Sequence, residues 1–346
     1  MRKFLLRRFA FLIPQLFVVS FLAFLLIKLL PGDPVLIILG PLRTQEGVIR
    51  ETKRLGLDKP FFVQYGRYVE RTVQGDFGNS IVTKQPVIEE LGRRVPATLW
   101  LITLGLVACV VIGIGVGYVA ALAPPTGWGT WLNKSIIGYG FLAGALPDFW
   151  VGLILVFIFF ATLGILPAPI GQLPGYIPSL LPDGPTNIDL LDTLIKGDFG
   201  QAGTAFRASI MPVVTLAIVY APVVLKITAV TTTEVFNSQY VTGARAVGVR
   251  RRTITRYIMR NALLPIVTTS GVLYAFLLGG AVLVETVFSW GGFGQYTVDA
   301  VNALDFNVIQ GMMLVAAVFT IVVYLLIDII HYFVDPRIRV STVGSS

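Results

Sequence analysis

Ionisable and redox-active side chains are scarce in this chain. Only 13% of its 346 residues are charged, against about 25% in average soluble domains. The single cysteine, Cys109, excludes an intrachain disulfide and a cysteine-based metal site, and the single histidine, His331, argues against a histidine-rich metal site. No Gly-Lys dipeptide occurs, so the chain has no Walker-A phosphate loop. If ATP drives this protein, another chain must hydrolyse it.

Apolar residues make up 55% of the chain, and the mean hydropathy is +0.78. Several mostly apolar runs reach about 20 residues, the length that crosses a bilayer core roughly 30 Å thick. In lipid the backbone must satisfy its own hydrogen bonds, so these runs are expected to be helices. The alternating pattern of an outer-membrane barrel is missing. We predict an all-α polytopic membrane protein with transmembrane helices at residues 9–30, 99–123, 136–163, 211–230, 266–288 and 308–334.

Basic residues in the short loops predict the orientation, because cytoplasmic loops are enriched in Lys and Arg. The N-terminus (1–8) has four basic residues, the loop 231–265 has six Arg and one acid, and the tail 335–346 has Arg337 and Arg339. The loop 289–307 has two Asp and no basic residue. Both termini are therefore expected in the cytoplasm. The net charge of +8 is explained by this topology, without a nucleic-acid partner.

Two longer polar segments are expected outside. The segment 31–95 has ten basic and eight acidic residues; it is long enough to escape the positive-inside rule, and we predict a small folded element with helices near 45–55 and 63–73. The loop 164–207 is rich in Pro and Gly. It is either a cover beneath a docked external protein or a tolerated insertion.

The loop 231–265 contains a pattern of two short helices. Ser238 is a plausible N-cap and Gly248 a plausible residue after the C-cap. Between them Tyr240, Ala244 and Val247 share one helical face. A helix this short is marginal alone in water and needs a surface to pack on. A second, Arg-rich helix is expected at about 251–263, with Pro265 as its boundary with the fifth span. The alternative is a basic loop that contacts anionic lipid.

Two acids lie in or beside predicted spans. Asp148 follows Pro147 near the middle of the third span, and charges at that depth usually face a cavity or a partner. It is either a pathway residue that meets a substrate amine or a cap on a helix restarted after Pro147. Glu285 ends the fifth span; it contacts the amino terminus of a bound substrate or a partner membrane subunit, or it is a solvated interfacial carboxylate.

Motifs along nearly the whole chain resemble ABC importer permeases of the dipeptide/oligopeptide/nickel family, in particular the first of their two permease subunits. The loop 239–265 is similar to that family's cytoplasmic EAA loop. The other matching motifs are Leu30-Pro-Gly-Asp-Pro34, Leu55-Gly-Leu-Asp-Lys-Pro60, Gly75-Asp-Phe-Gly-Asn-Ser80, Arg94-Val-Pro-Ala-Thr-Leu99, Val284-Glu-Thr-Val-Phe-Ser-Trp290, Gly292-Phe-Gly294 and Asp305-Phe-Asn-Val-Ile-Gln-Gly311.

The resemblance implies a type I importer fold in a bacterial or archaeal cytoplasmic (inner) membrane. It implies partners: a homologous second permease, two ABC ATPase subunits that bind ATP and Mg, and an external substrate-binding protein. The chain itself would be no enzyme and hold no cofactor. The coupling helix that docks on an ATPase would comprise Tyr240, Thr242, Gly243, Ala244, Arg245, Ala246 and Gly248, supported by Arg260, Asn261, Leu264 and Pro265.

Val247 departs from the family pattern, where Lys is common, and Thr242 replaces the Glu of the EAA signature. Peptides are the expected cargo, with nickel or another small solute as the alternative. An ion-gradient-driven secondary transporter would show inverted repeats and acid or His relays at the midplane, and only Asp148 fits that description. A membrane scaffold is the remaining class.

Overall fold

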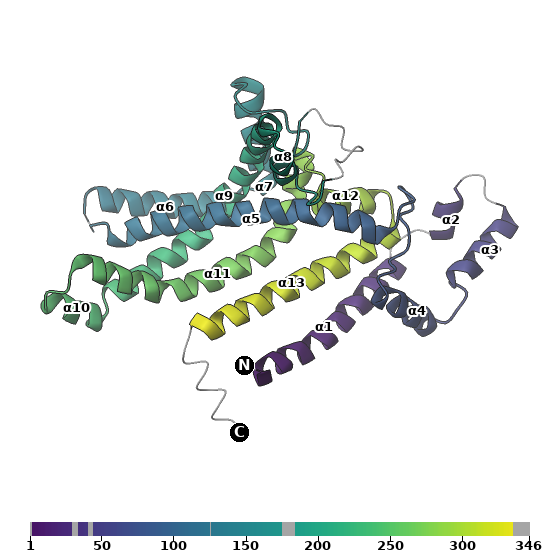
Figure 1. Ribbon diagram of the computed structural model, residues 1–346, viewed down its shortest axis with the longest axis horizontal. Helices are drawn as coiled ribbons and strands as arrows, with labels where there is room; N and C mark the ends of the chain where they lie inside the picture. The colour runs from purple at the N-terminus through teal and green to yellow at the C-terminus, as the bar shows by residue number, and fades with distance from the viewer. Residues whose placement is uncertain (1, 30–33, 41–43, 125, 175–183, 335–346) are drawn as a thin grey trace. The chain divides into compact units, whose positions relative to one another are not determined.

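The computed structural model describes residues 2–29, 34–40, 44–124, 126–174 and 184–334 (Figure 1). Helices dominate these residues, and the extended pairing among them is one isolated bridge between Asn79 and Pro86. The chain divides into two compact units. Unit 1 comprises Met1–Val95 and Gln295–Ile321, and unit 2 comprises Pro96–Gly294 and Val322–Ser346. The predicted tail 335–346 lies outside the described residues.

Five helices in the described part are long and apolar enough to cross a membrane. They are α1 (Arg2–Leu29), α5 (Val87–Leu122), α9 (Phe199–Phe236), α11 (Arg251–Phe288) and α13 (Phe306–Val334). A broken pair becomes a sixth candidate if it is counted as one span. The remaining helices are α2 (Pro34–Leu39), α3 (Gln45–Leu55), α4 (Phe61–Val73), α8 (Asp189–Ile195), α10 (Gln239–Ala246) and α12 (Phe293–Asn302).

The predicted third span, 136–163, is not one straight helix. The structure has α6 (Trp128–Ala145), then α7 (Asp148–Leu155), which runs into a π-helical turn at Val156–Thr162. The two parts meet at 103°. Pro147 causes the break, because it has no N–H to donate and it forces Leu146 into an extended conformation, with ψ at 129°.

Unit 1 packs the amphipathic helix α4 against α1 through aromatic rings. The ring of Phe24 lies 5.3 Å from that of Phe61 and stacks on Tyr68 at 5.5 Å. The hydroxyls of Ser20 and Tyr65 are 2.9 Å apart. The two short helices predicted near 45–55 and 63–73 are confirmed as α3 and α4.

Unit 2 is organised around α9 and α11. Each has 38 residues, so each is about 57 Å long, nearly twice the hydrocarbon core of a bilayer. Close packing of α5 on α9 needs two glycines four residues apart, since a Cβ on Gly113 would approach Val224 to 2.7 Å and one on Gly117 would approach the Leu225 carbonyl oxygen to 2.7 Å. Gly140 and Gly144 on α6 have the same spacing, but nothing lies within 4 Å of a Cβ at either position.

The helix boundary predicted at Pro265 is wrong. Pro265 lies inside α11, which continues without a break from Arg251 to Phe288. Proline is tolerated in long membrane helices when nearby side chains satisfy the backbone groups it disturbs. Pro265 lacks the N–H that would bond the Asn261 carbonyl, yet the helix continues; proline is more frequent inside membrane-spanning helices than inside soluble ones.

Candidate functional site

The helix α10 lies at the turn between the two longest helices, at the ends of α9 and α11 that lie furthest from α8 (Figure 1). It follows α9 after two residues, Asn237 and Ser238, and it precedes α11 by four. Short connections therefore join α10 to both long helices.

The ends of α10 are those predicted from the sequence. Ser238 is the N-cap residue, although its hydroxyl donates to the Val235 carbonyl (2.6 Å) instead of accepting from the helix. At the other end Gly248 has φ +75. Two backbone bonds close a Schellman motif there: the Val249 N–H donates to the Ala244 carbonyl (3.0 Å) and the Gly248 N–H donates to the Arg245 carbonyl (3.1 Å). The left-handed φ favours glycine at position 248.

One side of α10 is occupied by the fold itself. Val241 is 1% exposed and forms a small core with Ile254 and Ile258 of α11. Ala244 is half-buried and packs against the same core. The predicted common face of Tyr240, Ala244 and Val247 is therefore divided, because the bend between α9 and α11 turns Ala244 toward α11.

The opposite side of α10 is open. Tyr240 is 51% exposed and Val247 is 80% exposed. Arg245 lies with its guanidinium carbon 3.9 Å from the centre of the Phe236 ring, which holds this cation against the end of α9. The other predicted residues on α10 and its C-terminal turn are also exposed; they are Thr242, Gly243, Ala246 and Gly248.

The residues predicted to support this helix lie on the first half of α11. Arg260 and Asn261 are exposed, whereas Leu264 and Pro265 are half-buried. Arg252, Arg256 and Arg260 form an exposed basic stretch on α11 beside α10. The structure thus places an apolar and a basic surface next to each other at one end of unit 2.

Glu285 is not a solvated carboxylate at a membrane surface. It is 0% exposed, and the Thr98 hydroxyl of α5 donates to it at 2.5 Å. The same hydroxyl accepts from the Phe293 N–H at 2.8 Å. Gly292 and Gly294 crowd the carboxylate, because an added Cβ would lie 2.6 Å or 3.0 Å from its Oε2. Within this chain Glu285 therefore connects α5 to the end of α11.

Asp148 lies at the break between α6 and α7. Its Oδ1 accepts from the Phe149 N–H (2.8 Å), and its Oδ2 accepts from the Tyr220 hydroxyl of α9 (3.2 Å). The N-cap position belongs to Pro147, so Asp148 occupies the first turn of the restarted helix. It also borders two cavities of about 480 and 540 Å³, shared with Tyr220 and Phe276. The predicted N-cap role is therefore wrong, whereas the position beside two cavities is compatible with the predicted pathway role.

The chain matches two family sequence models that together span nearly its whole length. Residues 113–340 match the binding-protein-dependent transport system inner membrane component, and residues 1–102 match the N-terminal part of such membrane components. The chain belongs to this family. It is thus an integral inner-membrane permease of the ABC importer type, as the motifs indicated.

Named relatives of this permease share its full length. The di/tripeptide transport system permease DppB of Pseudomonas aeruginosa is 36% identical, and the alignment covers 98% of this chain and 99% of the relative. The dipeptide permease DppB of Escherichia coli K12 is 34% identical with the same coverage. The glutathione permease GsiC of Escherichia coli K12 is 32% identical over 98% of this chain and 99% of its own.

The structure explains why the permease motifs are scattered along the sequence. In unit 1, Asp305 accepts from the Ser80 hydroxyl (2.6 Å) and the Ile81 N–H (2.7 Å), which joins the motifs at 75–80 and 305–311. In unit 2, the Trp290 indole donates to the Ala97 carbonyl (3.0 Å), which joins the motifs at 94–99 and 284–290. Each of these four motifs supplies one half of a polar contact between distant parts of the sequence.

Three contributors were not singled out from the sequence. Thr98 was visible as part of a motif, but nothing in one sequence pairs it with Glu285. Tyr220 sits in an apolar run, and only the fold brings it to Asp148. Val241 lies on the buried side of α10, between exposed neighbours. Its apolar side chain was the signal of burial that the sequence offered.

Proposed function

We propose that this chain is the transmembrane permease of an ATP-driven peptide importer, that it forms half of the translocation pathway, and that α10 couples it to a separate ATPase. The observation that supports this most is the exposed apolar and basic surface of α10 at the turn between α9 and α11. The peptide cargo is supported by the relatives, which are named for dipeptide, di/tripeptide and glutathione transport.

The coupling follows from two properties of α10. Its inner side is fixed to α11 by Val241, Ile254 and Ile258, so a partner that moves α10 also moves α11. Its outer side presents Tyr240 and Val247 without a covering element among the described residues. A groove on an ATPase subunit that grips this outer side differently in its open and closed states would shift the permease between two arrangements.

The pathway role is assigned to Asp148 and withheld from Glu285. Asp148 borders both cavities of unit 2 described above, and its carboxylate has a single hydroxyl partner on α9. A carboxylate at a cavity wall suits the amino terminus of a peptide. Glu285 is buried and bonded, so it belongs to the scaffold.

The partners and the cofactor assignment complete the proposal. A second, homologous permease forms the other half of the pathway, and an external binding protein delivers the cargo. ATP and Mg belong to the ATPase subunits, and this chain holds no cofactor of its own. Both termini and α10 face the cytoplasm. Nickel or another small solute is the alternative cargo, and the names of the relatives favour a peptide.

Reconstitution tests the proposal. The complex isolated through a tag on this chain is placed in vesicles with its external binding protein and a labelled dipeptide. We expect uptake that needs ATP, the binding protein and the copurifying ATPase chains in fixed proportion to the permease. Uptake by this chain alone, driven by an ion gradient, would instead establish a secondary transporter.

A further inference from the structure

A basic pocket lies in unit 1 where α1 ends. It has a volume of about 550 Å³ and is bordered by α1, by α3 and the turn after it, by α4, and by the start of α13. Four cations line it, Lys28, Arg54, Arg67 and Arg71, against a single acid, Asp76. Lys28 belongs to the last turn of α1, so the pocket lies at the edge of the first candidate span, Phe11–Leu29.

Two of these four cations are already neutralised. Arg71 pairs with Asp76 at 2.9 Å and lowers the pKa of that carboxyl, and Arg54 pairs with Glu51 at 2.5 Å. Lys28 and Arg67 have no ion-pair partner in the part of the chain that the structure describes. The pocket therefore has an unbalanced positive charge at its rim.

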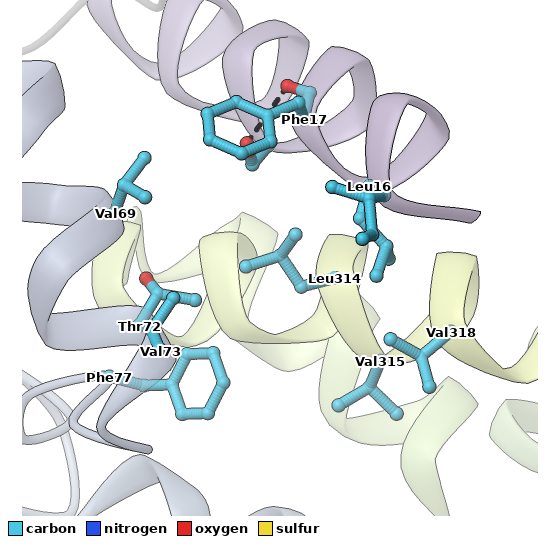
Figure 2. Close-up of a pocket in the computed structure, with 11 residues that line it drawn as sticks. Leu16, Phe17, Val69, Thr72, Val73, Phe77, Leu314, Val315 and Val318 are labelled. Atoms are coloured by element: carbon cyan, nitrogen blue, oxygen red, sulfur yellow. Dashed lines mark hydrogen bonds between the residues drawn. The ribbon is translucent and has the colours of Figure 1, made fainter. Parts of the chain in front are cut away.

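An apolar groove continues from this pocket along α1 and α13. Its volume is about 450 Å³, and Phe77 lines both cavities. Figure 2 shows Leu16 and Phe17 of α1 facing Leu314 and Val318 of α13 across the groove. From Phe306 in the pocket to Val318 in the groove, α13 advances about 18 Å, which compares with roughly 15 Å for one leaflet's hydrocarbon.

Polar groups without partners lie on α4, where the pocket meets the groove. The Gln64 Oε1 and the hydroxyls of Tyr68 and Thr72 are buried and make no hydrogen bond of normal geometry to a described residue. Gln64 and Tyr68 line the pocket, and Thr72 lines the groove. Burial raises the pKa of Tyr68 to about 12, and its hydroxyl, protonated at neutral pH even with an ordinary pKa, can donate a hydrogen bond. Buried polar atoms of this kind usually have a partner outside the protein chain.

We propose that the pocket and the groove together bind one anionic phospholipid, with its headgroup phosphate between Lys28 and Arg67 and one acyl chain between α1 and α13. The hydroxyls of Tyr68 and Thr72 donate to the ester oxygens, and Gln64 accepts from a headgroup hydroxyl. The order of cations, hydroxyls and apolar side chains matches the order of phosphate, ester and tail. The lipid would fix α4 to the membrane helices of unit 1.

The test uses the full chain in the complex extracted from membranes. Binding of phosphatidylglycerol and of phosphatidylcholine with the same chains is titrated by native mass spectrometry, with glycerol phosphate as a headgroup-only competitor. The charge variant is Lys28→Gln with Arg67→Gln. Its matched control is Arg50→Gln with Lys53→Gln, two exposed cations of α3 that do not line the pocket.

We expect phosphatidylglycerol to bind the unaltered protein in preference to phosphatidylcholine. The charge variant should lose that preference by roughly 25-fold, because each cation near an anionic surface contributes a factor of about five. The control pair should keep it. Equal binding of the two lipids, equal behaviour of variant and control, or full competition by glycerol phosphate would each overturn the proposal.

A second pair of variants tests the acyl-chain groove and leaves the cations unchanged. It keeps the proposal testable if the charge variant fails to fold. Val318→Trp fills the groove, whereas Val322→Trp, one turn further along α13 and equally exposed at 45%, lies outside the groove lining. Only Val318→Trp should weaken phosphatidylglycerol binding. Unchanged binding in Val318→Trp, or equal weakening in Val318→Trp and Val322→Trp, would contradict the assignment.

Discussion

The hydroxyl of Thr98 donates a 2.5 Å hydrogen bond to the carboxylate of Glu285, although the two residues are 187 positions apart in the sequence. Both side chains are buried, with exposures of 1% and 0%. A buried carboxylate that loses a hydrogen-bond donor keeps its full desolvation cost. This contact therefore fixes α5 to the end of α11 at a point where substitution is expensive.

Thr98→Val should destabilise the protein by about 1–3 kcal/mol, because it keeps the shape of the side chain and removes the donor to Glu285 and the acceptor for Phe293. The measurement is the thermal unfolding midpoint of the solubilised complex. Thr98→Ser keeps the hydroxyl and should lose much less stability. Equal midpoints for the two variants would show that the hydrogen bond contributes nothing.

Gly248→Ala should weaken the C-terminal turn of α10. Position 248 has φ +75, and this left-handed conformation costs a residue with a Cβ about 1–2 kcal/mol. Asparagine tolerates it better, so Gly248→Asn should retain more activity. The readout is ATP hydrolysis stimulated by cargo-loaded binding protein. If alanine and asparagine had the same effect, the conformation of the turn would not be the cause.

Gly280→Ala should impair cargo uptake, whereas Gly279→Ala should not. A Cβ at position 280 would clash with the Tyr220 hydroxyl and push it away from Asp148. Nothing lies within 4 Å of a Cβ at position 279. Both glycines line the same cavity, so the pair is matched. The measurement is the peptide concentration for half-maximal uptake. Equal values for the two variants would exclude a role for the Tyr220–Asp148 contact.

Asp189 on α8 predicts a pH-dependent stability. Burial, with the neighbouring Asp192 as a second cause, raises the pKa of Asp189. The native state therefore holds this proton more tightly than the unfolded chain does. As pH rises through the folded-state pKa, this carboxyl lowers the free energy of unfolding. Asp189→Asn should be more stable than the unaltered protein near neutral pH, with the difference shrinking toward about pH 4. A difference independent of pH would refute this.

The membrane class, the helix-rich fold and the family could be predicted from the sequence, because hydropathy, loop charge and motifs are local signals. The turns around α3 and α10 were predictable for the same reason: Gly56 and Gly248 mark left-handed caps. The lengths of α9 and α11 were not predicted, because helices continue past the apolar run wherever their polar extensions still pack. Pro265 misled the prediction, because a proline inside a long membrane helix need not end it.

The contacts between distant residues could not be predicted from one sequence. Glu285 has the same local pattern whether it faces water or Thr98, and the fold alone decides between them. Helical spacing placed Ala244 on one face with Tyr240 and Val247; such spacing gives relative positions on a helix but not which side meets α11. The sharp bend at Pro147 was visible as a break, but its angle of 103° was not.

Crosslinking from α10 tests the central claim most directly. A photoreactive amino acid is placed at Val247, the most exposed apolar position of the α10 turn, and for comparison at Val301 of α12, which is 50% exposed. After irradiation of intact membranes, the account predicts an adduct between position 247 and an ATP-binding subunit, and none from position 301. An adduct of position 247 with an external protein, or an ATPase adduct from position 301 alone, would contradict the account.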